Sequence, residues 1–212
     1  MKAKRVMLYC LAGLVAGCVP IVSLNPLFTK GDIVFDEMLL GTWTQEGGDA
    51  GLSWDFARFE EGSTEGLPKD LQSEFKRLYR LHVTDKDGRK GVLAACLVKL
   101  GDRRFLDIFP DQFPSGEPDP EKTKLMYNAF FFVSSHSFIR VDALGDQLKI
   151  HLTDDDEFKR LVAVEPKAVA YAATEERPIL TASTQELQAF VTKYADDARL
   201  FPNELVLVHK SK

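Results

Sequence analysis

The sequence predicts a mostly β protein, an antiparallel β-barrel with a C-terminal amphipathic helix and short accessory helices. Apolar and polar residues alternate with period two through the middle of the chain, turn residues separate these stretches, and one helical stripe follows near the C-terminus. The chain has 212 residues, of which 45% are hydrophobic and 28% are charged. This is long enough and apolar enough to bury the core of one domain.

The N-terminus carries the pattern of a secretion signal. Three cations without an acid precede an apolar run over residues 6–16, and small residues precede Cys18. The run is shorter than the roughly 20 residues that a transmembrane helix needs. The stretch from Leu14 to Cys18 resembles the lipobox of bacterial lipoproteins, in which the cysteine becomes the acylated first residue of the mature chain.

By this resemblance, residues 1–17 form a lipoprotein signal peptide, 18–36 a lipidated N-terminus and tether, and 37–212 the barrel domain. We expect acyl chains on Cys18 to hold the protein in a bacterial membrane, on its non-cytoplasmic face. Val19 is not the aspartate that resembles an inner-membrane retention signal, so the outer membrane is favoured where two membranes exist. An ordinary signal peptide cut elsewhere and an uncleaved anchor are the alternatives.

The net charge and the cysteine content limit the partners and the thiol chemistry that we expect of this protein. The formal net charge is −5, and loss of the three cations in the signal peptide takes it to −8. An acidic surface repels phosphate backbones, so nucleic acid is not an expected partner and acyl chains must supply the membrane attachment. Cys10 leaves with the signal and Cys18 carries lipid, which leaves Cys96 in an apolar run, where we expect a buried, inert thiol.

The first predicted element is a short turn over residues 37–40, capped by Asp36 and ended by Gly41. A helix is expected after Pro68, and a long surface loop over 110–124. Alternation between turn residues predicts strands at 52–56, 79–84, 92–100, 105–109, 137–141 and 148–152.

The C-terminal third mixes helices and strands. The acid-rich stretch 154–157 predicts the first turn of a short helix. Ser183 and Glu186 form a capping box before a helix whose apolar residues recur at i, i+3, i+4 and i+7. Short strands are predicted at 168–172, 179–182 and 205–209.

Gly41-Thr42-Trp43, on the first predicted strand, resembles the G-x-W signature of lipocalins and related calycins. About eight meandering strands, followed by an amphipathic helix and one more strand, also resemble the lipocalin topology. The resemblance implies that Trp43 packs at the closed end of the barrel, with a basic residue across it, for which Arg177 is the candidate. The chain departs from the family by an inserted helix at 154–166 and by the lack of a T-D-Y-type motif.

Uncharacterised bacterial lipoproteins with a lipobox, a short tether and a lipocalin-like domain resemble the chain over nearly its whole length. This resemblance implies a fold and a location but no activity. The alternative for the fold is another small antiparallel barrel or a sandwich.

Catalytic and metal-binding patterns are weak in this sequence. Serines flank His136, with Asp107 or Asp142 as an orienting acid, which is the residue set of a serine hydrolase. Adjacent strand residues face opposite ways, however, and no G-x-S-x-G elbow is present. The acids at 154–157 suit a helix cap better than a cation, and the histidine spacing supports no zinc site. We therefore expect neither an enzyme nor a cofactor or metal.

The aromatic residues on the strands point to two functions. The first is a non-enzymatic envelope lipoprotein that binds an apolar or amphipathic small molecule in a barrel cavity. The second is a protein-interaction or structural lipoprotein with a filled barrel, because large inward side chains also fill a small barrel. A hydrolase is a third, less favoured reading. The residues expected to line the cavity are Trp54, Phe56, Tyr79, His136, Phe138 and Arg140.

Overall fold

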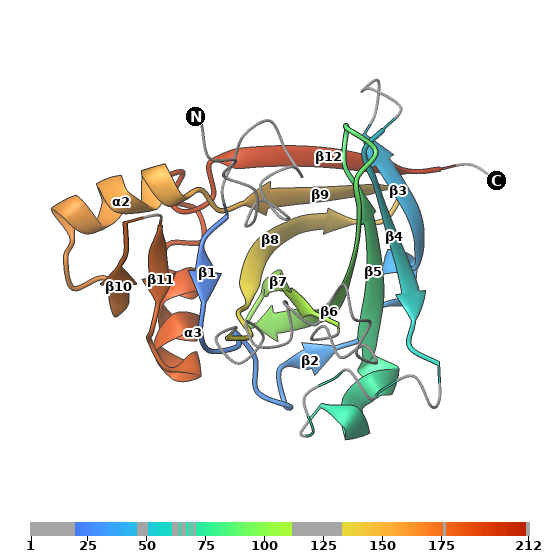
Figure 1. The fold of residues 1–212 in the computed structure, drawn as a ribbon, viewed down its shortest axis with the longest axis horizontal. Coiled ribbons are helices and arrows are strands. Elements are labelled where there is room, and N and C mark those ends of the chain that lie inside the picture. Colours follow the sequence, from blue (N-terminus) through green and yellow to red (C-terminus); the bar gives the residue numbers. More distant parts are fainter. Residues whose placement is uncertain are drawn as a thin grey trace, which may run out of the picture.

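Eight strands form a closed antiparallel barrel, so the predicted fold class is confirmed (Figure 1). The computed structural model describes residues 20–45, 51–60, 64, 67, 69, 71–111, 133–175 and 177–210. Around the barrel the strands follow chain order, and pairing of the last with the first closes the ring. They are β3 (Gly41–Gln45), β4 (Ser53–Arg58), β5 (Leu78–Thr84), β6 (Lys90–Leu100), β7 (Arg103–Pro110), β8 (Ser137–Leu144), β9 (Gln147–Leu152) and β12 (Asn203–His209).

Alternation along these strands gives the wall two apolar faces. One face forms the barrel interior, a cluster of buried side chains from all eight strands. The other forms a second cluster, on the outside of β6, β7 and β8. Strands buried on both faces have nearly continuous apolar runs, which explains the composition of residues 94–98 in β6.

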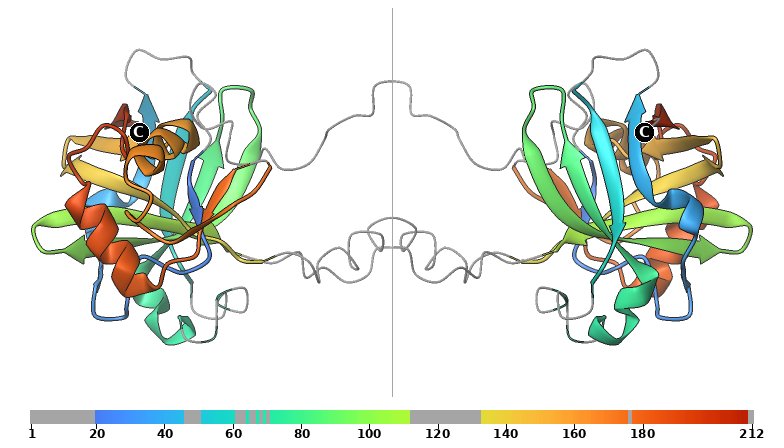
Figure 2. Two further views of the ribbon diagram at one scale, coloured as in Figure 1. Left: turned by 90° about the vertical axis from the view of Figure 1, so that its left-hand side faces the viewer. Right: turned by 90° about the vertical axis from the view of Figure 1, so that its right-hand side faces the viewer.

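An accessory layer covers this outer face (Figure 2). It contains two helices, α2 (Asp155–Val164) and α3 (Thr184–Lys193), whose predicted caps at Asp154 and Ser183 are confirmed. A small sheet completes the layer, with strand order β1 (Val22–Ser23), β11 (Pro178–Leu180) and β10 (Tyr171–Ala173).

The accessory layer interrupts the meander earlier than the sequence predicts. The first seven barrel strands, β3 to β9, follow one another along the chain. The accessory elements α2, β10, β11 and α3 come next. The eighth barrel strand, β12, then pairs with β9 on one side and β3 on the other. The amphipathic helix thus precedes the eighth barrel strand instead of following it. Its apolar stripe explains this place, since Leu187, Phe190 and Val191 are buried against the outer wall.

The helix expected after Pro68 is a 3₁₀ helix, η2 (Gln72–Arg77), rather than a longer α-helix. Its N-terminal residue has no side-chain cap, and none of its own residues is buried, so little favours a longer helix there. The apolar residues Leu67, Leu71 and Leu78, which suggested the helical spacing, are buried in the outer cluster.

The turn before β3 is formed as predicted. The Asp36 side chain accepts a hydrogen bond from the Met38 N–H and caps η1 (Glu37–Leu39). Gly41 follows with φ +109°, and a Cβ there would lie 2.8 Å from Cε1 of His209. Both the backbone conformation and the contact therefore require glycine at this position.

Part of the segment predicted as a tether packs against the domain, as its apolar residues indicate. Ile21, Leu27, Phe28 and Ile33 are buried in the outer cluster. β1 belongs to the small sheet, and β2 (Ile33–Val34) pairs with the end of β6. We call residues 20–28 the N-terminal strap. Cys18 lies outside the described residues, as does most of the predicted 110–124 loop.

Candidate functional site

The six residues expected to line one cavity lie on two sides of the barrel wall. Trp54, Phe56 and Tyr79 belong to the interior cluster. Along β8, Ile139 and Val141 point into the barrel, so the residues of opposite parity point out. His136, Phe138 and Arg140 accordingly lie on the outer side, with Phe138 in the outer cluster.

Large side chains fill the barrel interior. The ring of Phe56 lies between those of Trp54 and Tyr79, at centroid distances of 6.2 and 6.0 Å. The Tyr79 hydroxyl donates to the Asp36 carbonyl at 3.0 Å and accepts from the Asp36 N–H at 2.7 Å. Burial raises the pKa of Tyr79 to about 12, so this hydroxyl stays a donor at physiological pH.

The two tryptophans of the interior differ in their hydrogen bonding. The Trp43 indole N–H donates to the Leu39 carbonyl at 2.8 Å. The indole N–H of Trp54 is buried and has no acceptor within the described part of the chain. Burial of a donor without an acceptor reduces the stability of the fold. Of the aromatic residues in the predicted set, Trp54 therefore offers a hydrogen-bond donor to a ligand in the barrel interior.

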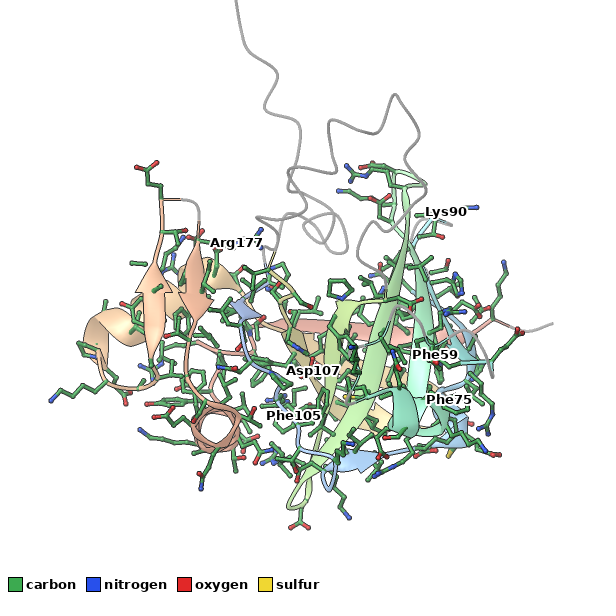
Figure 3. All side chains as sticks on the ribbon, turned by 60° about the horizontal axis from the view of Figure 1, so that its bottom comes forward. Phe59, Phe75, Lys90, Phe105, Asp107 and Arg177 are labelled. Atoms are coloured by element: carbon green, nitrogen blue, oxygen red, sulfur yellow. The ribbon has the colours of Figure 1, made fainter. Side chains whose placement is uncertain are left out.

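The residue that packs across Trp43 is His209, not Arg177. The His209 and Trp43 rings have a centroid distance of 4.0 Å. Arg177 lies at the small sheet, away from the barrel (Figure 3), where its N–H donates to Thr174 Oγ1. The insertion before β12 displaces residue 177 from the barrel, and the end of β12 supplies a ring instead. The core position of Trp43 itself agrees with the sequence analysis.

On the outer wall, Asp107 and His136 form a buried pair. Asp107 is labelled in Figure 3. His136 Nδ1 lies 2.7 Å from Asp107 Oδ1, and the Leu27 N–H donates to Asp107 Oδ2 at 2.7 Å. The rings of Phe28 and Phe109 flank the imidazole at centroid distances of 6.1 and 5.1 Å. The pair therefore joins β7, the start of β8 and the N-terminal strap.

An imidazole held by a buried carboxylate is the general-base half of a catalytic triad, which also requires a nucleophile beside the imidazole. Ser23 lies opposite His136, but it is fully buried and its Oγ accepts from the Asn25 N–H. Ser137 is buried and pairs with Ile108. Within the described residues the His136 ring bonds to Asp107 and to no serine hydroxyl.

The thiol next to this pair is unsuited to catalysis as well. Cys96 lies directly across from Asp107 in the β6–β7 ladder and is fully buried. Burial raises the pKa of the Cys96 thiol, and the charge of Asp107 raises it further, so the reactive thiolate is not formed. The geometry of this region suits a clamp that holds the strap on the barrel.

A second polar cluster surrounds Arg140. Its guanidinium donates to both carboxylate oxygens of Asp142, at 2.6 and 2.8 Å, and also to the Ala195 carbonyl after α3. Burial opposes ionisation of Asp142, but the hydrogen bonds and charge of Arg140 outweigh it and hold the pKa of Asp142 below its usual range. The cluster fastens the end of α3 to β8.

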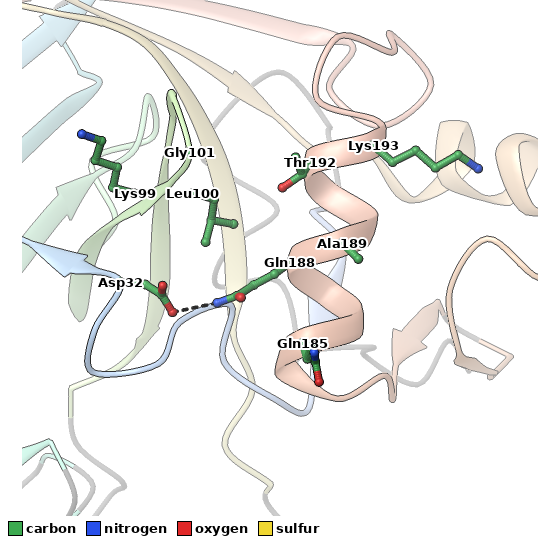
Figure 4. A pocket seen from close by; sticks show the side chains of 9 residues that line it. All are labelled: Asp32, Lys99, Leu100, Gly101, Gln185, Gln188, Ala189, Thr192 and Lys193. Carbon is green, nitrogen blue, oxygen red and sulfur yellow. Dashed lines mark hydrogen bonds between the residues drawn. The ribbon is translucent and has the colours of Figure 1, made fainter.

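The described residues form open clefts outside the barrel, among them one beside α3 and one beside α2. The larger, of about 610 Å³, lies between α3 and the β6–β7 turn, where Gln188 donates to Asp32 (Figure 4). Its two lysines, Lys99 and Lys193, point away from the cleft (Figure 4). A smaller cleft, of about 420 Å³, lies beside Pro166 after α2. Neither reaches the interior cluster.

Among the described residues, no group of three or more histidine, cysteine or carboxylate side chains is arranged to hold a metal ion. The same residues contain no helix long and apolar enough to cross a membrane. Comparison of the chain with family models, curated proteins and solved structures gives no match. The lipocalin-like topology therefore rests on the strand order and packing of this chain.

Proposed function

We propose that this protein is an envelope lipoprotein, acylated at Cys18, whose filled barrel serves as a rigid support for a partner-binding outer surface. The observation that carries the proposal is the packing of the interior, where large buried side chains from all eight strands meet. A barrel filled in this way leaves little room for a ligand inside, which favours recognition on the outer surface. We propose a non-enzymatic role, because among the described residues the His136 ring bonds to Asp107 and to no serine hydroxyl.

A second candidate function is the capture of a small amphipathic molecule inside the barrel. The unpartnered Trp54 indole N–H favours it, because a guest with an acceptor oxygen would satisfy this donor. Such a guest requires the interior side chains to move apart, which is why we place this function second.

The membrane attachment is tested by fractionation of cells that produce the wild-type protein or Cys18→Ser. Several long acyl chains contribute about 0.8 kcal/mol per buried methylene, so the wild type should stay in washed membranes and the variant should be released. Cys96→Ser is the matched control, since its buried thiol should play no part in anchoring. Persistence of Cys18→Ser in washed membranes would contradict the proposal.

The partner is sought by crosslinking from the outer surface in intact cells. Substitutions to a photoreactive residue at exposed positions, such as Met38 and Val92, should yield discrete adducts with an envelope protein. The same substitution at the interior position Leu207 is the control and should yield none.

A further inference from the structure

We propose that the barrel domain lies directly against the lipid headgroups of its own membrane, with the face around the N-terminal strap turned toward them. The inference rests on the proposed acylation of Cys18 and adds an orientation to it. The barrel domain contacts the lipid surface because only a short length of chain connects the acylated Cys18 to the first fixed residue of the strap.

The strap is fixed from Ile21 onward. The Ile21 side chain is fully buried, and its N–H donates to Thr153 Oγ1 at 3.1 Å. Ser23 then exchanges two backbone hydrogen bonds with His136, each of 2.8 Å, on one edge of β1. On the other edge, β1 pairs with β11, and the Leu24 N–H donates to the Leu180 carbonyl. Both edges of the strap are therefore held.

The distance from the anchor to this fixed point is small. Two residues, Val19 and Pro20, separate Cys18 from Ile21, and a fully extended chain covers at most about 11 Å over these three Cα–Cα steps. A domain of this size has a radius of gyration of about 16 Å. Because the connection is shorter than the domain's own radius, the domain cannot turn another face to the bilayer without pulling the strap off the barrel.

The fixed point also defines a near and a far end of the barrel. Thr153 directly follows β9, whose other end leads to the turn at Gly145 and Asp146. Six strand residues span about 20 Å, so this turn lies well away from the anchor. Leu24, a large apolar side chain that is 42% exposed, lies at the near end.

Charge at the near end is compatible with a zwitterionic lipid surface. The first turn of α2, next to Thr153, carries Asp155 and Asp156, but Lys159 lies 3.2 and 2.9 Å from their carboxylates. Arg160 likewise pairs with Glu157 in the same helix. Two cations thus offset two of the four acids at 154–157, and the remaining negative charge is not repelled by a lipid surface of zero net charge.

The test uses the full acylated protein in phosphatidylcholine vesicles that contain a headgroup-nitroxide lipid. A fluorophore is attached to Leu24→Cys at the near end or Asp146→Cys at the far end. Buried Cys96 should not be labelled. We expect nitroxide quenching at least threefold stronger at residue 24 than at residue 146. Asp156→Cys serves as a second near position, because its side chain is 74% exposed.

A 20-residue Gly/Ser insertion between Val19 and Pro20 is the control for the tether. It adds a reach of about 25 Å, so quenching at the near and far positions should become similar. Equal quenching at both ends with the native tether would overturn the proposed orientation while leaving anchoring intact. Failure of the wild-type protein to sediment with vesicles would overturn the anchoring and, with it, this inference.

Discussion

The interior of the barrel and the layer on its outer wall are both buried, but different interactions hold them together. The interior contains no buried charged side chain among the described residues, and its cluster consists of apolar and aromatic groups. The outer layer buries Asp107, His136 and Arg140 beside its apolar residues. Size and shape thus define the interior, whereas specific polar contacts define where the strap and α3 attach.

The largest expected effect is in the interior. Trp43→Ala should reduce the free energy of unfolding by about 3 to 5 kcal/mol, because it removes a fully buried ring and leaves a cavity. Denaturant unfolding followed by circular dichroism measures this loss. An unchanged unfolding midpoint would contradict the core assignment of Trp43.

The corresponding change in the outer layer is Asp107→Ala. It leaves His136 and the Leu27 N–H without their acceptor and should cost about 3 kcal/mol. The double variant Asp107→Leu with His136→Leu should recover part of this loss, since no polar side chain of the pair stays buried. If the double variant were less stable than Asp107→Ala, the pair would not be the clamp described above.

A third comparison is between the two tryptophans. Trp43→Phe breaks a buried hydrogen bond and leaves the Leu39 carbonyl without its donor, whereas Trp54→Phe removes a donor that has no acceptor among the described residues. Trp43→Phe should therefore be the more destabilising by about 1 kcal/mol in thermal or urea unfolding. The opposite order would show that Trp54 has a bound partner inside the barrel.

The smallest expected effect is that of Asp142→Asn, and it should depend on pH. Arg140 holds the folded-state pKa of Asp142 below the ordinary value of 3.8, so ionised Asp142 stabilises the fold above that value. The variant should cost about 0.5 kcal/mol at pH 7. The difference from wild type should shrink as the pH falls through 3.8 toward the folded pKa, because both proteins then carry an uncharged group. A pH-independent difference would contradict this assignment.

Sequence patterns predicted the barrel strands and the interior well, because alternation and turn residues act locally. Trp54 and Phe56 alternate with their neighbours along β4, which predicts that both lie on one buried face of the strand. The outer layer was harder to predict. Phe138 follows the same alternation, but its place outside the barrel depends on cover from α3 and the strap, elements far away in sequence.

The site residues show the same limit. Asp107 was recognisable as a candidate acid for His136, and the structure brings the two together. The Leu27 N–H that completes the pair lies 80 residues away in sequence and leaves no local signal. His209 packs across Trp43 because the two residues are directly paired in the register of β12 and β3. The spacing of residues in the sequence does not indicate this pairing.

The most direct test of the filled barrel is native mass spectrometry of the mature protein, purified from its own envelope. We expect the mass of the acylated chain alone, both before and after incubation with a lipid extract from the same cells. A stoichiometric, non-covalent ligand that appears reproducibly would contradict the filled barrel and would establish capture of a small molecule as the function.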